Sequence, residues 1–149
     1  MRIGIDFGGV LSKSDEKNNY NTSLDMPGAL EALLFLKKQG HTLFLISFAG
    51  RQRSLDTRMS INKTCPGLFD QMFFVKEKSL KALVVKMLGI HVMIDDLNEN
   101  LQEVARVNPF CKTILFENWD KTLRILSTFV PADVDPNTDP ELERKIKLY

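Results

Sequence analysis

The sequence predicts one α/β domain built on a doubly wound parallel sheet of about five strands, in three layers with helices on both faces. Short apolar runs alternate with segments of helical periodicity, a spacing typical of parallel strands joined by crossover helices. The 149 residues, 44% hydrophobic and 26% charged, are enough for one core of ordinary composition. No internal repeat divides the chain, so we expect a core domain at residues 1–130 and a tail at residues 131–149.

The expected strands are short apolar runs bounded by glycine or polar residues. They cover residues 3–7, 41–47, 71–75, 91–96 and 112–116. The first run, IGIDF, ends before a glycine pair, and the fourth, HVMIDD, ends on two acidic residues.

The expected helices lie between these strands. The first starts near Pro27 and stops at Gly40, and its apolar residues at helical spacing are Leu30, Leu33, Leu34 and Phe35. The others cover residues 51–63, 79–89, 99–107 and 119–130, whereas residues 12–26 read as a loop or small hairpin. We expect the core to include Phe35, Phe44, Phe73, Phe74 and Trp119. The tail, with three prolines and many charges, is expected to be loosely ordered or to form a short helix.

Composition excludes several classes of protein. The formal net charge of +1 leaves no global field that would recruit nucleic acid, so any phosphate-binding surface has to be local. Cys65 and Cys111 lie far apart and in no metal-ligand spacing, which favours a reducing compartment over a disulfide framework. No apolar run is long enough to cross a membrane, and the first residues lack the features of a signal peptide. We therefore expect a soluble cytoplasmic protein without a membrane partner, and nothing in the sequence indicates its oligomeric state.

Polar side chains close several of the expected strands. Asp6 ends the first strand, Ser47 the second, and Asp95 and Asp96 the fourth. In doubly wound sheets the carboxyl ends of the strands meet on one edge, where ligands bind. Three carboxylates there would form a hard, oxygen-rich cluster of the kind that suits Mg²⁺. The alternative for the Asp95–Asp96 pair is a turn or a cap of the helix that follows.

Four motifs, in order, resemble those of the haloacid dehalogenase superfamily, whose members are mostly phosphatases and phosphotransferases. The first is Asp6-Phe7-Gly8-Gly9-Val10 after an apolar strand, and the second is LFLIS ending at Ser47. The third is a lysine near the start of the helix before the fourth strand, and the fourth is HVMIDD. The resemblance covers roughly residues 1–126 and implies a Rossmann-like core.

The resemblance implies a role for each matching residue. Asp6 would be the nucleophile that accepts the phosphoryl group, and also a Mg²⁺ ligand. Ser47 would donate a hydrogen bond to a phosphoryl oxygen, and its alternative is a strand-end hydroxyl bonded to the backbone. Asp96 would bind Mg²⁺ directly, with Asp95 beside it or in the layer behind it. The backbone carbonyl of Gly8 would be a further ligand.

The third motif offers three lysines, Lys76, Lys78 and Lys81. The spacing from Lys81 to the acidic pair looks most like that of family members without a cap domain, so Lys81 ranks first and Lys78 second. The chosen lysine would neutralise charge on the nucleophile and on the phosphoryl group. The others are expected to be solvated charges on the helix surface.

Position 8 departs from the family pattern. The family's hydrolases usually carry a second aspartate there, which protonates the leaving group and later activates water, whereas this chain has Gly8. General acid–base catalysis is worth ~10²–10⁴-fold in rate. Two hypotheses follow: a Mg²⁺-dependent phosphatase, or a weak or inactive member that binds or regulates. Asp15 and Glu16 are the nearest substitutes in sequence, although ordinary loop charges are the favoured interpretation of both.

The substrate expected from the resemblance is large. The two positions at which family members insert a cap domain hold about fifteen residues and essentially none, which predicts a capless protein with an open site. Such a site suits a phosphorylated nucleic-acid or nucleotide end, or a phosphoprotein. The residues expected to contact the substrate are Gly9, Phe48, Arg51 and Arg53.

Overall fold

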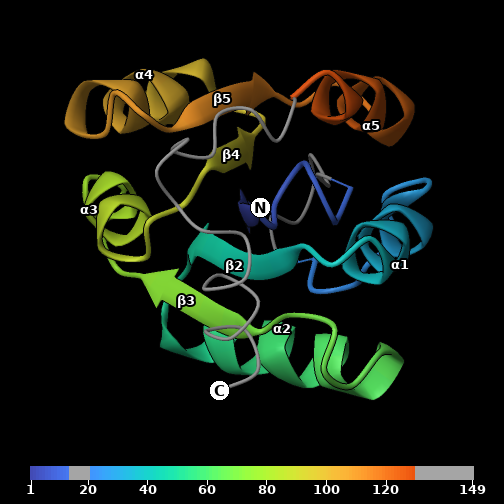
Figure 1. The fold of residues 1–149 in the computed structure, drawn as a ribbon. Helices are drawn as coiled ribbons and strands as arrows, with labels where there is room; N and C mark the ends of the chain where they lie inside the picture. Colours follow the sequence, from blue (N-terminus) through green and yellow to red (C-terminus); the bar gives the residue numbers. More distant parts are fainter. Residues whose placement is uncertain (14–20, 130–149) are drawn as a thin grey trace, which may run out of the picture.

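The computed structural model describes residues 1–13 and 21–129. Within these residues a five-stranded parallel sheet has the order β3-β2-β1-β4-β5. Its strands are β1 (Arg2–Ile5), β2 (Thr42–Phe48), β3 (Gln71–Val75), β4 (Val92–Asp95) and β5 (Lys112–Leu115). The chain starts at the central strand and extends the sheet first to one side and then to the other, so the predicted doubly wound sheet is confirmed (Figure 1).

Helices cover both faces of this sheet, as a doubly wound topology requires. They are α1 (Ala29–Lys38), α2 (Arg51–Thr64), α3 (Leu80–Met87), α4 (Asn98–Val107) and α5 (Trp119–Ser127). In Figure 1, α1 and α5 lie on one face, α3 and α4 lie on the other, and α2 runs beside the edge strand β3. None of the helices in the described ranges is long and apolar enough to cross a bilayer.

Strand β2, next to the central strand β1, shows why the apolar runs form strands rather than helices. Alternate side chains of a strand point to opposite faces. Leu43 and Leu45 belong to the larger cluster of buried residues, with Leu33 of α1 and Ile61 of α2. Phe44 and Ile46 belong to a second cluster, which includes residues of α3 and α4. Because both faces are buried there, residues 43–46 of the strand are apolar at every position.

One core prediction is wrong. Phe35 is 49% exposed, and Leu34 is 45% exposed. Helix α1 instead buries Ala29, Ala32, Leu33 and Leu36, the i, i+3, i+4, i+7 face, and this face turns positions 34 and 35 towards solvent. The other aromatic predictions stand: Phe44 and Trp119 are buried, and Phe73 and Phe74 are partly buried against the core.

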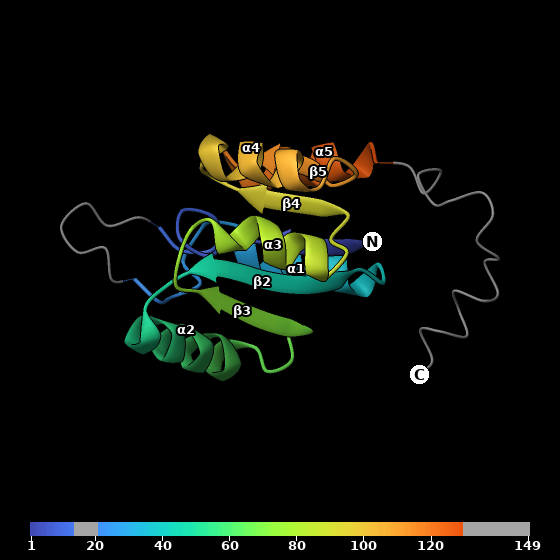
Figure 2. The same cartoon turned by 90° about the vertical axis from the view of Figure 1, so that its left-hand side faces the viewer.

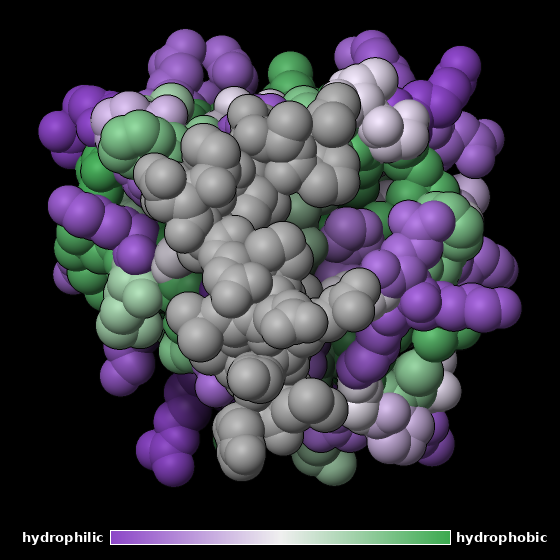
Figure 3. Space-filling view, viewed as in Figure 1, coloured by the Kyte–Doolittle hydropathy of each residue, from purple (hydrophilic) through white to green (hydrophobic). Residues whose placement is uncertain are grey.

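The surface mixes polar and apolar residues. In Figure 3 hydrophilic side chains lie around most of the outline and hydrophobic ones reach the surface between them.

The connection from β3 to α3 is only residues 76–79, so no inserted domain stands at the second cap position. The predictions for Asp15 and Glu16 and for the tail at 131–149 lie outside the described residues.

Candidate functional site

The carboxyl ends of the strands define the edge at which the polar residues gather. Figure 2 shows β2, β3 and β4 with their arrowheads at the same end of the sheet. Strand β1 pairs with β2 on one side and with β4 on the other. The order of the strands along the chain therefore changes direction across the sheet at β1. A ligand is expected at such a switch point, beyond the ends of β1 and β4.

Asp6 lies at this point, directly after β1. Its backbone N–H donates to the Ile94 carbonyl over 3.0 Å, so the ladder with β4 holds the residue in line with the strand. A tight turn follows, in which the Phe7 carbonyl accepts the N–H groups of Leu11 at 2.8 Å and of Val10 at 3.2 Å. The Trp119 indole N–H donates to the Val10 carbonyl over 2.9 Å and ties this turn to α5. Asp6 is buried, with only 6% of the residue exposed.

Lys81 is the cation that meets Asp6. Its Nζ lies 2.9 Å from Asp6 Oδ1 and 3.0 Å from Asp95 Oδ2, and the lysine is 3% exposed. Lys76 and Lys78 are exposed, and Lys78 Nζ lies 5.8 Å from the centre of the Phe48 ring. Of the three lysines considered, the structure therefore places Lys81 among the strand-end carboxylates.

Asp95 is fully buried at the end of β4, and both of its oxygens have partners. Oδ2 accepts from Lys81 and, over 3.1 Å, from Asn100 Nδ2 in α4. Oδ1 accepts from the Leu97 backbone N–H over 3.0 Å, so Asp95 also closes a turn, as the alternative interpretation expected. It does not cap α4, whose first residues have no side-chain cap. These bonds hold Asp95 as a support for Lys81.

Asn100 is a site residue that the sequence interpretation missed. Its position in the sequence could have pointed to it, because Asn100 lies in the first turn of α4, the helix that follows β4. From there its side chain reaches Asp95 at the end of that strand. The sequence DDLNEN carries amide and acidic residues at several neighbouring positions, and periodicity alone does not separate Asn100 from Asn98.

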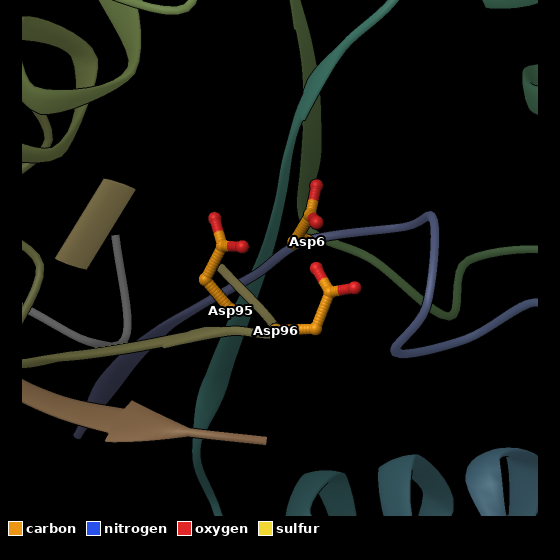
Figure 4. A group of neighbouring side chains, drawn as sticks. All are labelled: Asp6, Asp95 and Asp96. Carbon is orange, nitrogen blue, oxygen red and sulfur yellow. The ribbon is translucent and has the colours of Figure 1, made fainter. Parts of the chain in front are cut away.

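Asp6, Asp95 and Asp96 form an acidic cluster, in which one oxygen of each carboxylate lies within 4.8 Å of the others. Figure 4 shows the three side chains converging from the ends of β1 and β4. Burial raises the pKa of Asp6 to about 7, and the Asp95 carboxylate adds to this rise while Lys81 opposes it. Burial and the neighbouring Asp95 also raise the pKa of Asp96.

The cluster holds one cationic side chain for three carboxylates. Burial lowers the pKa of Lys81, but the Asp6 and Asp95 carboxylates outweigh that effect and the pKa lies above its ordinary value, so Lys81 stays charged. One ammonium then faces three carboxylates. Buried carboxylates are stable only when cations or donors compensate them. A hard, oxygen-only donor set with an uncompensated charge fits Mg²⁺, and Asp6 and Asp96 are the residues that would hold it.

Gly9 makes room for Asp96. Its φ is +77°, a conformation that glycine adopts without strain, and an ideal Cβ at this position would lie 2.0 Å from Asp96 Oδ2. A side chain at position 9 would therefore displace the carboxylate that is expected to bind metal.

We expect Gly9→Ala to lower the free energy of unfolding by ~1–3 kcal/mol and to weaken Mg²⁺ binding, because it combines backbone strain with displacement of Asp96. Calorimetric Mg²⁺ titration and thermal unfolding check this. Gly40→Ala is the matched control, since Gly40 has a φ of +89° but no atom within 4 Å of its Cβ position. The control should lose stability and keep its Mg²⁺ affinity; equal loss of affinity in both variants would contradict the role of Gly9.

Gly8 is different, because no atom crowds the position that its side chain would take. The nearest heavy atom to its ideal Cβ, chain neighbours aside, is Arg53 Nη2 at 3.7 Å, an ordinary van der Waals distance. Its φ lies outside the positive range, so a side chain at position 8 would be tolerated by the backbone. The space that an aspartate would fill is therefore bordered by an arginine from the first turn of α2.

The remaining predicted residues share this end of the sheet. Ile5 pairs with Leu45, so Ser47 stands one residue further along β2 than the level of Asp6, and it is 6% exposed. Phe48, 43% exposed, ends β2. Arg51 begins α2 and is exposed, whereas Arg53 is half-buried. The structure thus brings Asp6, Lys81, Asp95 and Asp96 together, and it places Arg53 beside Gly8.

A scan against protein-family models and a search of curated proteins found no match. Solved structures do match. One is a D,D-heptose 1,7-bisphosphate phosphatase from B. bronchiseptica, complexed with magnesium and phosphate, at a TM-score of 0.61 and 14% identity over 99% of both chains. Another is a HAD-superfamily hydrolase from Ehrlichia chaffeensis, at a TM-score of 0.51 and 16% identity, covering 68% of this chain. The chain has the haloacid dehalogenase fold.

A third neighbour with this fold is a chain of the Pnkp1/Rnl/Hen1 RNA repair complex, at a TM-score of 0.60 and 18% identity over 76% of this chain. The protein spans 41% of that chain and 57% of the Ehrlichia hydrolase. At these identities the likeness shows the haloacid dehalogenase fold alone. The resemblance expected from the four sequence motifs is confirmed at the level of fold.

Proposed function

We propose that the protein is a Mg²⁺-dependent phosphatase in which Asp6 is the nucleophile. The observation that carries the proposal is the buried contact of Asp6 with Lys81, beside Asp95 and Asp96, at the carboxyl edge of a haloacid dehalogenase fold. Lys81 holds the Asp6 carboxylate in place and offsets the charge that gathers when a phosphate approaches it. Asn100 and the Leu97 N–H fix Asp95, which in turn fixes Lys81.

The reaction has two steps. An Asp6 oxygen attacks phosphorus, the P–O bond to the leaving group breaks, and an aspartyl-phosphate forms. Water then attacks that phosphorus, the P–O bond to Asp6 breaks, and phosphate and free Asp6 result, with one proton released. When bound, Mg²⁺ supplies positive charge that the phosphoryl oxygens and the carboxylates share. Ser47 donates to a phosphoryl oxygen in this scheme, and the Gly8 carbonyl is a further candidate ligand.

The substrate class is supported by the neighbours and by the short β3–α3 connection. One neighbour is a sugar bisphosphate phosphatase and another belongs to an RNA repair complex. An open site without a cap domain would accept a phosphorylated nucleic-acid or nucleotide end, or a phosphoprotein, next to Phe48 and Arg51. A cytoplasmic location stays a prediction.

A second candidate function is a protein that binds phosphate and metal without turnover. The observation that favours it is the absence of a carboxylate at position 8. Among the described residues, and chain neighbours aside, the only heavy atom within 4 Å of the Cβ position is Arg53 Nη2. Arginine stays protonated near neutral pH and provides no general acid.

The two candidates differ in one assay. The full chain is incubated with Mg²⁺ and p-nitrophenyl phosphate, 3′- and 5′-phosphorylated oligonucleotides, or a phosphopeptide, with a chelator as control. Release of phosphate that depends on Mg²⁺ is the expected result. No release from any of these substrates or from ADP, with Mg²⁺ and a phosphate analogue still bound by calorimetry, would establish the binding function instead.

A further inference from the structure

The Arg53 side chain lies beside position 8, close to the predicted nucleophile. Its place there affects which kind of phosphate bond the site can break. Among the described residues, and chain neighbours aside, its Nη2 is the heavy atom nearest to the ideal Cβ position of Gly8, at 3.7 Å. Gly8 lies two residues after Asp6, so a group at this position borders the space around the nucleophile. Arg53 makes no ion pair with any described carboxylate, and it is half-buried on α2.

The chemistry of a guanidinium differs from that of a carboxylic acid. An acid gives a proton to a leaving group, whereas arginine keeps its protons and stabilises an anion through charge and paired N–H donors. A leaving group that departs beside Arg53 is therefore stabilised as an anion. The fork of N–H groups matches a phosphate in particular.

We propose that the preferred substrate is a phosphoanhydride, with Arg53 bound to the phosphate that leaves. This inference rests on the proposed phosphatase function of Asp6. Attack of Asp6 on the terminal phosphorus breaks the P–O bond to the bridging oxygen, and the electron pair departs on the second phosphate. That phosphate is a weak base, since a phosphate monoester has a second pKa of about 6, so the step needs no proton donor.

An alkyl phosphoester behaves differently at this site. Its leaving group is an alkoxide, about as basic as hydroxide, since the pKa of water is ~15.7. Without an acid the alkoxide departs unprotonated, and the loss is of the general acid–base order, ~10²–10⁴-fold. The absence of a side chain at position 8 thus selects for a leaving group that needs no proton.

The test compares ADP, an anhydride, with AMP, an alkyl ester of the same nucleoside. We expect the full chain with Mg²⁺ to release phosphate from ADP with a kcat/KM at least ~10²-fold above that for AMP. Arg53→Gln should lower the ADP value by about tenfold or more and change the AMP value less. Lys63→Gln, which removes an exposed charge near the other end of α2, is the control and should change neither.

Position 8 provides the reverse test. Gly8→Asp alone would place a carboxylate next to Arg53, which would hold it ionised and unable to donate a proton. We therefore expect the double variant Gly8→Asp/Arg53→Gln to hydrolyse AMP faster than either single variant, and the ADP preference to shrink.

A binding measurement tests the role of Arg53 independently of turnover. Calorimetry with imidodiphosphate, a non-hydrolysable anhydride analogue, should show about tenfold weaker binding by Arg53→Gln, with orthophosphate affected less. Equal rates on ADP and AMP, or an Arg53→Gln effect equal for both, would overturn the anhydride inference; turnover of p-nitrophenyl phosphate would still support the phosphatase. No turnover of any of these three phosphates would overturn both proposals.

Discussion

Asp6→Asn is expected to lower phosphatase activity by about 10³-fold or more while leaving the fold intact. Asparagine has nearly the shape of aspartate, keeps an oxygen that can accept from Lys81, and is a far weaker nucleophile. The measurement is Mg²⁺-dependent phosphate release from p-nitrophenyl phosphate, beside circular dichroism of both proteins. Activity that persists in the variant would point to another nucleophile or to a contaminant.

The same variant should be more stable than the parent at alkaline pH without metal. Burial raises the pKa of Asp6 from 3.8 to about 7 in the folded state. Between these values the folded protein binds a proton that the unfolded chain has lost, so stability falls as pH rises from about 4 to about 7. Asp6→Asn removes this group, and with it the like-charge repulsion from Asp95 and Asp96.

Thermal unfolding in chelator, at about pH 5 and about pH 8, checks the sign. We expect the melting temperature of Asp6→Asn to exceed that of the parent at the higher pH by roughly 3–6 °C, which corresponds to ~1–2 kcal/mol. The difference should shrink at the lower pH, where Asp6 of the parent is protonated. A variant less stable than its parent at both pH values would show that Asp6 stabilises the fold through Lys81.

Lys81→Met is expected to cost ~3–5 kcal/mol of folding free energy, the largest stability effect of any change at the site. Methionine fills nearly the same volume, so the loss is electrostatic. The substitution removes the cation within 2.9 Å of Asp6 and 3.0 Å of Asp95 and leaves two buried carboxylates facing each other. Denaturant unfolding measures the free energy directly.

Two comparisons make the Lys81 result specific. Lys78→Met, on the preceding turn, removes an exposed lysine whose described partner is the Phe48 ring and should change stability by no more than ~0.5 kcal/mol. Adding Asp6→Asn to Lys81→Met should recover more stability than Asp6→Asn adds to the parent, because the uncompensated charge at Asp6 exists only when Lys81 is absent. Simple addition of the two single effects would contradict a direct interaction between Lys81 and Asp6.

The fold could be predicted because the sheet imposes a simple pattern. A strand buried on both faces reads as a nearly continuous apolar run, and β2 is recognisable by the run at residues 43–46. The carboxyl ends of parallel strands share one edge of the sheet. This rule was enough to predict that Asp6, Asp95 and Asp96 lie close together. Lys81 could be ranked first among three lysines because its spacing from the acidic pair resembles that of family members without a cap domain, and the structure places it in the cluster.

Other features depend on side-chain directions that spacing does not encode. The helical spacing of Phe35 suggested burial, but the direction of the α1 face follows from how the helix docks on the sheet. Asn100 is one of several polar residues in the first turn of α4, and only the rotation of that helix aims it at Asp95. The approach of Arg53 to Gly8 joins a helix and a turn that are far apart in sequence, and no local pattern reports it.

Trapping the covalent intermediate tests the central claim most directly. The full chain is mixed with Mg²⁺ and a phosphorylated substrate, quenched in acid during turnover, and digested for mass spectrometry. Phosphate on the peptide that contains Asp6, absent from Asp6→Asn and absent without Mg²⁺, is the predicted result. Turnover with no phosphate on Asp6, or with phosphate on another residue such as Ser12 or Ser47, would contradict the assignment of Asp6 as nucleophile.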